Sequence, residues 1–156
     1  MTQTRWLDAD QQRAWRAYLL GAQRLSEALN RQLEDDAGIS LSEYEILVRL
    51  SETEGRTMRM SELAAQIMHS RSRVTHTVAR MERRGLVRRE ACSDDRRGVN
   101  CVMTDEGWDL LVRTAPGHVE AVRRNLVDLL APEDFAALGR IMATVADGPD
   151  AQVATG

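Results

Sequence analysis

The sequence predicts a mainly α-helical fold with a small β-hairpin. Apolar residues recur at the three- and four-residue spacing of amphipathic helices in several segments of the chain. One region, residues 86–103, instead has two runs of strand-forming residues around a polar tip. Apolar residues make up 43% of the 156 residues, which is enough for a core. The length fits one domain, or one domain plus an oligomerisation extension.

The first helix is expected over residues 10–36, and Gly38 follows it as a C-cap. Trp15 and Leu19 widen its apolar face beyond what one small domain needs. This excess indicates a partner helix. The apolar stripe itself consists of Ala14, Tyr18, Ala22, Leu25, Leu29 and Leu33.

Two shorter helices are expected next. Ser40 or Ser42 caps the first of them, and Gly55 stops it. Ser61 opens the second. The residues expected to point into the core are Tyr44, Leu47, Val48 and Leu50 from the first helix, and Leu63, Ala64 and Ile67 from the second.

A basic helix then begins after its cap, Ser70, and ends at Gly85. Val74, Val78 and Met81 recur at i, i+4 and i+7, so they form its buried stripe. Ser72, His76, Ala79, Arg80 and Arg83 fall on the opposite side, with Arg71 and Arg73 in the first turn and Thr75 beside them.

The hairpin is expected to pair residues 86–92 with residues 99–103 around a tip at 93–98. Thr104 caps the helix that follows, and Pro116 should kink or interrupt it. A last helix starts at Pro132. It ends where the composition turns small and polar.

The net charge of −3 is distributed unevenly. Residues 71–97 contain nine Arg and four acidic residues, a net of +5 that leaves −8 for the rest of the chain. All 21 basic residues are Arg, whose planar guanidinium suits phosphate and guanine. A basic helix with small polar residues near its N-terminus, followed at once by a basic hairpin, predicts a surface that binds duplex DNA in two grooves.

An ordered series of short motifs resembles the MarR-type winged helix-turn-helix regulators over roughly residues 10–146. The order and the spacing of the motifs support this resemblance together. They are Leu63-Ala64, Ser70-x-Ser72-x-Val74-Thr75, Arg84-Gly85-Leu86-Val87-x-Arg89, Asp95-Arg96-Arg97 and Met103-Thr104-x-x-Gly107.

The resemblance implies a winged helix-turn-helix lobe over residues 40–104, in which the hairpin is the wing. It also implies N- and C-terminal dimerisation helices over residues 10–36 and 108–146. Together these segments would form a single domain of residues 1–146. A disordered tail is expected over 147–156.

The function implied is that of a sequence-specific DNA-binding transcriptional regulator, a repressor, that binds a pseudo-palindromic inverted-repeat operator as a homodimer. The 70–84 helix would enter the major groove and the 93–98 wing tip the minor groove, with Asp95 bracing the wing. The expected DNA-binding residues are Ser70, Arg71, Ser72, Arg73, Thr75, His76, Arg80, Arg83, Arg96 and Arg97. Arg83 and Arg84 could instead pair with Glu82, Glu90 or the acidic residues of the wing.

Two forms of control are compatible with the sequence of such a regulator. If the hairpin is centred between Arg96 and Arg97, Cys92 and Cys101 face each other across the strands and could form a redox pair, against the alternative of two small apolar side chains in a reducing cytosol. Relatives in the family bind small aromatic acids, and an aromatic ligand pocket here would involve Trp15, Tyr18, Tyr44, Trp108 and His118.

Other classes of protein are disfavoured by what the sequence does not contain. It has no nucleophile–base pair, P-loop or dinucleotide fingerprint, so we expect no enzyme and no cofactor. The histidines and cysteines lack the spacing of a metal site. There is no secretory signal and no membrane span, which favours the cytoplasm. A winged-helix module that binds protein is the remaining alternative, and it would need acidic or apolar residues on the outer helix face.

Overall fold

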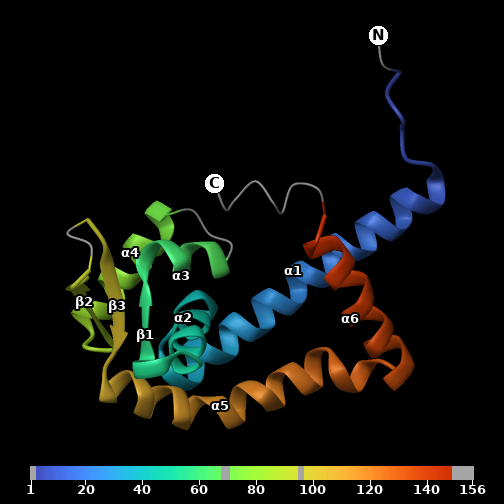
Figure 1. The fold of residues 1–156 in the computed structure, drawn as a ribbon. Coiled ribbons are helices and arrows are strands. Elements are labelled where there is room, and N and C mark those ends of the chain that lie inside the picture. Colours follow the sequence, from blue (N-terminus) through green and yellow to red (C-terminus); the bar gives the residue numbers. More distant parts are fainter. Residues whose placement is uncertain (1–2, 68–70, 95–96, 149–156) are drawn as a thin grey trace.

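The computed structural model describes residues 3–67, 71–94 and 97–148. Figure 1 shows a lobe at one end, from which two long helices extend together toward a third helix. The elements in chain order are α1 (Ala9–Ala37), α2 (Leu41–Ser51), η1 (Glu54–Arg56), β1 (Thr57–Arg59), α3 (Met60–Gln66), α4 (Arg71–Arg83), β2 (Val87–Ala91), β3 (Val99–Met103), α5 (Asp105–Asn125), η2 (Val127–Leu129) and α6 (Pro132–Ala146). The sequence-based expectations that lie outside the described residues concern Ser70, Asp95, Arg96 and the tail from residue 149 onward.

The first helix, α1, agrees with the predicted segment, residues 10–36, to within one residue at each end. Asp8 and Gln11 form a capping box at its start, and Gly38 ends it in the left-handed conformation with φ of 63°. Only Leu33 of α1 is buried. Trp15 and Leu19 are about half exposed, so the apolar surface that predicted a partner helix is uncovered in the single chain.

Ser40, and not Ser42, caps α2. Its hydroxyl accepts the amide N–H of Glu43 and the Glu43 carboxylate accepts the amide N–H of Ser40, which closes a capping box. The helix ends at Ser51, four residues before the predicted stop at Gly55. The short helix α3 begins at Met60 rather than at a Ser61 cap, because Arg59 occupies its N-cap position.

The sheet contains a strand that the sequence did not predict. The described strands pair antiparallel in the order β1-β3-β2, so the expected hairpin has a third strand on its inner edge. β1 is only three residues long, and Met58 is its one buried side chain. Such a segment is too short to show a period-2 pattern. The predicted hairpin strands themselves are confirmed as β2 and β3.

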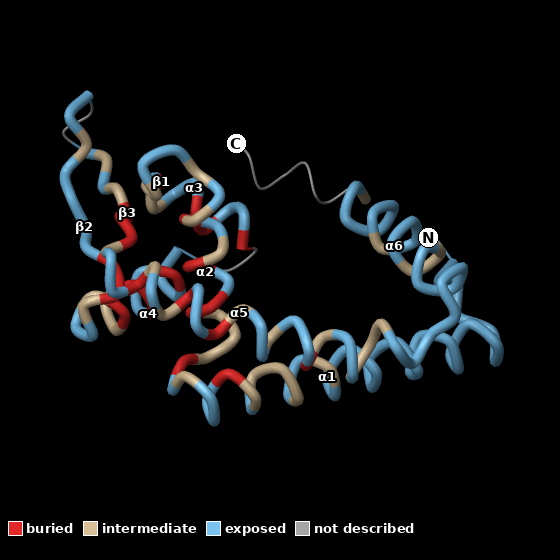
Figure 2. The backbone as a smooth tube through the Cα atoms, turned by 90° about the horizontal axis from the view of Figure 1, so that it is seen from below, coloured by how far each residue is buried: buried red, intermediate tan, exposed pale blue. Residues whose placement is uncertain are grey.

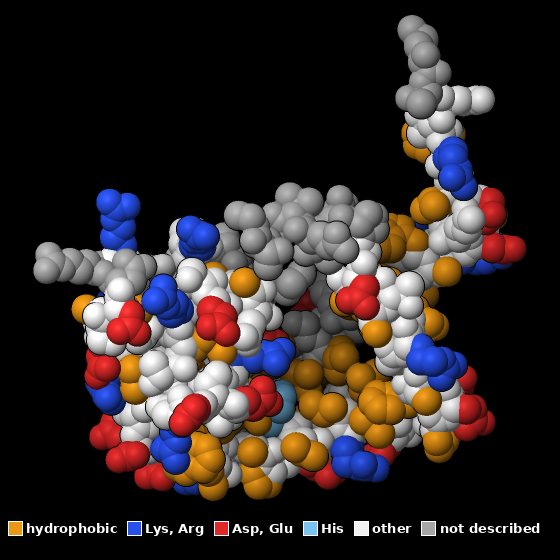
Figure 3. Space-filling model, in the orientation of Figure 1, with side chains coloured by type: hydrophobic (Ala, Val, Ile, Leu, Met, Phe, Trp, Pro, Cys, Tyr) orange, Lys and Arg blue, Asp and Glu red, His pale blue; other side chains and the backbone are white. Residues whose placement is uncertain are grey.

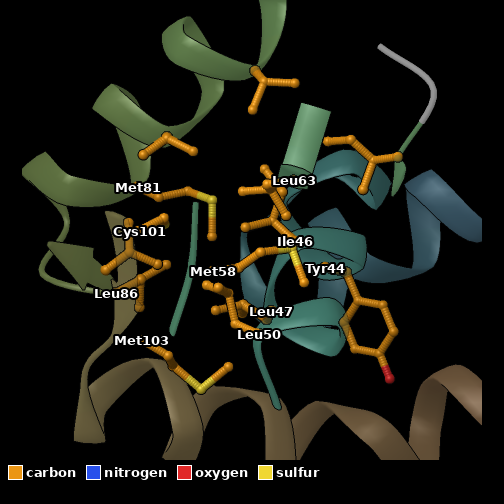
Figure 4. Packing of buried hydrophobic residues seen from close by; sticks show 14 of the residues in the cluster. Tyr44, Ile46, Leu47, Leu50, Met58, Leu63, Met81, Leu86, Cys101 and Met103 are labelled. Atoms are coloured by element: carbon orange, nitrogen blue, oxygen red, sulfur yellow. The ribbon is translucent and has the colours of Figure 1, made fainter. Parts of the chain in front are cut away.

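The core lies inside the lobe, beneath α4. Figure 4 shows side chains from α2, α3, α4 and the sheet converging there, with Met81 facing Leu63 and Ile46 across the gap between elements. Val74, Val78 and Met81, the predicted stripe of the basic helix, are 1%, 0% and 0% exposed. Because the core fixes the inner side of α4, its opposite side faces out of the lobe.

The C-terminal helices leave the lobe and carry little buried surface. Thr104 caps α5 as predicted, and α5 continues through Pro116 without interruption. This corrects the expectation of a break. α6 begins at Pro132 as predicted, but it contains no buried residue. Figure 2 shows the buried positions gathered in the lobe and exposed positions along most of α1 and α6. No described helix has the length and apolarity needed to span a membrane.

The first turn of α5 packs closely on the strand side of the lobe. A Cβ atom built on Gly107 would overlap the carbonyl oxygen of Leu86 and stand 3.1 Å from the Met103 side chain. The same carbonyl accepts the amide N–H of Thr104, and the Thr104 hydroxyl donates to the carbonyl of Gly85 at 2.6 Å. The glycine in this motif is therefore required by the close approach of two backbones.

We expect Gly107→Ala to lower the free energy of unfolding by about 1 to 3 kcal/mol, because the methyl group has to displace backbone. Urea unfolding at one fixed protein concentration measures the change. Gly139→Ala is the control, since a Cβ there meets nothing within 4 Å in the chain and a helical Gly→Ala change gains up to about 1 kcal/mol. Equal stability of Gly107→Ala and the unsubstituted protein would contradict the packing argument.

Candidate nucleic-acid interface

The outer side of α4 presents short polar and basic side chains to solvent. Ser72, Thr75, His76 and Arg83 are exposed, as is Arg71 in the first turn. The Thr75 hydroxyl donates to the Arg71 carbonyl at 2.8 Å. Figure 3 shows arginine side chains distributed over the upper part of the lobe, on the side where the wing tip projects. The face has the size and charge that a major-groove helix needs.

Arg80 does not belong to this outer face, which corrects its predicted role. Its Nε donates to Glu43 Oε1 at 2.9 Å, and its Nη2 lies 3.5 Å from the Ser40 hydroxyl. A helical wheel gives the angle of Arg80 around α4 but not the position of α2, which lies close enough to capture the guanidinium. Arg73, two turns earlier on the same side, is exposed and lines a cavity together with Glu45 of α2.

Glu43 is the centre of a junction between three helices. Its side chain is only 3% exposed, yet it is held by the Ser40 amide at 2.7 Å and by Arg80 at 2.9 Å. Arg84 lies 3.9 Å from the same carboxylate and donates to the carbonyl of Gly38, the C-cap of α1, at 2.8 Å. The C-terminus of α1, the N-terminus of α2 and the basic helix are thereby bound together.

The sequence left open which partners the charged residues at the C-terminal end of α4 have, and the structure shows that these partners differ. Arg84 takes part in the Glu43 junction, whereas Arg83 forms no ion pair with any described residue. Glu82 instead binds Arg89 of β2, accepting both its amide and its guanidinium at 2.8 Å. These hydrogen bonds lower the pKa of Glu82. α4 is thus attached to the wing as well as to α2.

The wing presents one described arginine near its tip. Arg97 is exposed within the turn, while Arg96 and Asp95, which was predicted to brace the wing, lie outside the described residues. Gly98 closes the turn, and its carbonyl accepts the amide N–H of Cys92. A Cβ on Gly98 would stand 2.8 Å from Cys92 Sγ, so this position has little room for a side chain.

The predicted Cys92–Cys101 pair is wrong. Cys101 pairs with Arg89 in the β2–β3 register, three positions from the expected partner. An odd shift of register moves a side chain to the other face of the sheet. Cys101 is fully buried in the core, and burial raises its pKa to about 12. Since thiolate is the reactive form, the Cys101 thiol is protected from oxidation. The structure therefore argues against a redox response through a Cys92–Cys101 pair.

The aromatic residues assigned to one ligand pocket lie in three separate places. Trp15 and Tyr18 stack on each other along α1, with ring centroids 5.8 Å apart, and both are about half exposed. Trp108, at the start of α5, lies beneath the Arg56 guanidinium at 4.0 Å. The predicted set therefore does not form a single site.

Tyr44 and His118 do meet, and they line one cavity. Their ring centroids are 4.3 Å apart, and His118 Nδ1 lies 3.1 Å from Gln32 Oε1 of α1. The cavity has a volume of about 510 Å³ and also includes Arg49. Burial lowers the pKa of His118, and it raises that of Tyr44. Among the residues that the structure describes, no group of three or more His, Cys, Asp or Glu side chains could hold a metal ion.

Sequence reasoning missed Glu43 as an organising residue. Its signal was present, because Ser40 and Glu43 have the spacing of a capping box. The burial of the carboxylate and its capture by Arg80 had no sequence signal, since they depend on how α2 and α4 cross.

Known proteins share both the sequence and the fold of this chain. The model of the MarR family matches residues 39–99. Sco3205, a MarR family transcriptional regulator from Streptomyces coelicolor solved in complex with DNA, is 49% identical with a TM-score of 0.91, over 94% of this chain and 91% of that one. AbsC, a MarR family transcriptional regulator from the same organism, is 46% identical with a TM-score of 0.87, over 92% and 97%.

A curated relative matches over a shorter stretch. The HTH-type transcriptional regulator PecS of Dickeya dadantii (strain 3937) is 34% identical over 95 residues, which is 60% of this chain and 55% of PecS. The chain thus aligns with about half the length of the curated relatives it matches.

We expect Arg80→Ala to destabilise the protein by about 1 to 3 kcal/mol, because it leaves the buried Glu43 carboxylate without its main partner. Arg83→Ala is the matched control, an exposed arginine one turn away, with a change within about 0.5 kcal/mol. Glu43→Gln combined with Arg80→Ala should cost less than the two single changes together. Denaturant unfolding at one protein concentration measures all four variants, and strict additivity would exclude the coupling.

The half-buried His118 predicts a pH dependence of stability. Its pKa is lower in the folded protein than the ordinary value of 6.5, so the unfolded chain binds a proton first as the pH falls. Stability is therefore full above about pH 7 and declines as the pH drops through 6.5. Melting temperatures of His118→Gln should vary less with pH between 7.5 and 5.5 than those of His76→Gln, an exposed control. Parallel curves would contradict this assignment.

Proposed function

The chain belongs to the MarR family of transcriptional regulators, and we propose that it is a sequence-specific DNA-binding repressor that binds an inverted-repeat operator as a homodimer. The observation that carries the proposal is the exposed basic side of α4 beside a wing that presents Arg97. Sco3205, which is similar over most of both chains, was crystallised with DNA. In this proposal the protein is not an enzyme, and it acts on DNA in the cytoplasm.

The outer side of α4 suits the major groove. Ser72, Thr75 and His76 are short or planar polar groups that can hydrogen-bond to base edges. Arg71 and Arg83 lie toward the two ends of the helix, where guanidinium groups would meet the flanking phosphates. Acidic or large apolar residues, which a protein-binding winged helix would need, are missing from the described part of this face.

The wing suits the minor groove. Arg97 is exposed at the projecting end of the hairpin, and a narrow minor groove concentrates the negative potential that attracts a guanidinium group. The Glu82–Arg89 contact holds β2 against α4, so it links the two elements that we propose to face DNA. Helix and wing would therefore dock on the same duplex together.

The helices outside the lobe suit a twofold partner. Large apolar side chains are uncovered on α1 and α6, including Trp15, Leu19 and Ile141 at 51%, 46% and 59% exposure. An apolar cavity of about 470 Å³ lies between α1, α5 and α6. We assign dimerisation to residues 10–36 and 108–146 and DNA binding to residues 40–104, within one domain of residues 1–146. The two copies of α4 would then stand about 34 Å apart, in successive major grooves.

A small aromatic acid is the ligand class that we propose for the Tyr44–His118 cavity. Two aromatic rings border the cavity, and Arg49 offers a cation to a carboxylate. The cavity touches α1, α2 and α5, which join the lobe to the dimerisation helices. A ligand that altered this junction would change the spacing of the two recognition helices.

Binding of the protein to duplexes selected from a random pool tests this function. We expect an inverted repeat, with affinity that falls steeply as salt rises. Arg97→Ala should weaken binding by about tenfold to hundredfold, and His76→Ala should reduce the preference for selected over random DNA. Arg88→Ala, an arginine of the same sheet at the end away from the wing tip, is the control for charge. Failure to bind any duplex, or binding as a monomer, would overturn the proposal.

A further inference from the structure

The end of α4 is hydrogen-bonded to both long helices through two consecutive residues. Arg84 Nη1 donates to the carbonyl of Gly38, the C-cap of α1, at 2.8 Å. The carbonyl of Gly85 accepts the hydroxyl of Thr104, the N-cap of α5, at 2.6 Å. α1 and α5 pack on each other and leave the lobe together (Figure 1). The corner where α4 ends and the wing begins is therefore attached to the lobe end of each long helix.

The bond to Gly38 fits the charges at the end of α1. The last turn of that helix contains Glu34, Asp35 and Asp36 and has no basic residue, although the C-terminus of a helix favours a cation. Arg84 supplies the cation from a different element. Its guanidinium also satisfies a carbonyl of the kind that a helix leaves without an intrahelical partner at its C-terminus.

The backbone around Arg84 is fixed, so its side chain has a defined origin. Gly85 ends α4 in the left-handed conformation with φ of 74°. Its N–H donates to the Glu82 carbonyl at 2.9 Å, and the next N–H, of Leu86, donates to the Met81 carbonyl at 3.1 Å. The Arg84 side chain itself is 39% exposed and lies outside the core. Removing it therefore takes away the bond to α1 and leaves the core in place.

The direction of the lobe relative to α1 decides where α4 stands in the proposed dimer. One more base pair between two half-sites shifts the second half-site by about 3.4 Å along the duplex and turns it by about 34°. The 13 residues of α4 span roughly 20 Å, so a lobe that rotates by about 10° moves the far end of α4 by roughly 3.5 Å. The accepted separation of half-sites is thus sensitive to contacts that tie α4 to α1.

We infer that Arg84 is a positioning residue that determines which separation of half-sites the dimer accepts. The inference rests on the proposed function, and it adds a residue that acts through Gly38 and does not touch DNA. With the bond in place, the lobe keeps one direction relative to α1. Without it, Thr104 still connects the lobe to α5 and Arg80 still compensates Glu43, but the lobe can rotate toward neighbouring separations.

Binding to inverted repeats with identical half-sites, and with spacers that differ by one base pair, tests the inference. We expect the unsubstituted protein to prefer one spacer over its neighbours by about tenfold or more, and Arg84→Ala to reduce this preference to about threefold or less. Its preference for the half-site sequence over random DNA should be unchanged. Arg88→Ala, which removes the same charge from the exposed side of β2, should keep the spacer preference. Arg84→Lys should restore part of it, because an ammonium group can still donate to the Gly38 carbonyl.

Two results would overturn the inference. Arg84→Ala could keep the spacer preference, or it could lose affinity by the same factor on every spacer. A uniform loss is what a direct phosphate contact or a weakened fold would produce. Thermal unfolding shows whether each variant is folded, and Arg84→Gln repeats the test if Arg84→Ala is not. If the unsubstituted protein binds no duplex at all, the proposed function fails instead.

A second measurement needs no DNA. A spin label on His76→Cys, in protein that also carries Cys92→Ser, reports the distance between the two copies of α4, since Cys101 is buried and stays unlabelled. We expect Arg84→Ala to broaden the distribution of that distance and Arg88→Ala to leave it unchanged. Equal widths with and without the Arg84 side chain would contradict the inference. A labelled protein that stays monomeric would give no distance, and the proposed dimer would then fail.

Discussion

The carboxylate of Glu43 lies almost fully buried where α1, α2 and α4 meet, and its charge has to be compensated there. An uncompensated buried charge costs several kcal/mol, so the surrounding groups are constrained to stay in place. Arg80 supplies the compensating charge from the basic helix, and Arg84 extends the contact to the end of α1. This arrangement ties α4 to α2 and to the end of α1 within the lobe. It therefore helps to set the direction in which the exposed residues of α4 face.

The wing is held by a different set of contacts, at the same C-terminal end of α4. Arg89 binds Glu82 of α4, while Thr104 and Gly107 hold the end of β3 against Leu86. α4 and the wing are therefore both attached to the same lobe. The helices that extend from the lobe have no comparable core of their own, and their apolar faces remain uncovered in the single chain. The molecule thus combines a lobe that has its own core with extended helices whose apolar side chains are uncovered in the single chain.

Sequence periodicity predicted the helices, in which the apolar pattern repeats over several turns. It missed the features that depend on how separate elements pack against each other. The stripe of Val74, Val78 and Met81 located α4 and its buried side, because a helix of this length repeats its pattern several times. β1 could not be predicted, since a strand of three residues is too short to show an alternating pattern of buried and exposed side chains. The pairing of Cys101 was wrong because the sequence around the tip does not fix the number of residues in the turn.

The candidate site was predicted to the same extent. Exposed positions of α4 and Arg97 followed from helical phase and from the resemblance to a family. Arg80 was misplaced because its partner comes from α2, 37 residues earlier in the chain. The aromatic set divided into three groups for the same reason: residues on separate helices meet only where tertiary packing brings those helices together, as for Tyr44 and His118.

The continuity of α5 through Pro116 gives the long helix a mechanical property. The N-terminal end of α5 packs on the strands at Gly107. Its C-terminal end leads into α6, where apolar side chains are uncovered. Its 21 residues span roughly 30 Å, so that a tilt of about 5° at one end displaces the other by roughly 3 Å. A slight repacking at the α6 end of α5 would therefore displace the lobe by about the length of a hydrogen bond. A displacement of that size is enough to form or break its contacts with DNA.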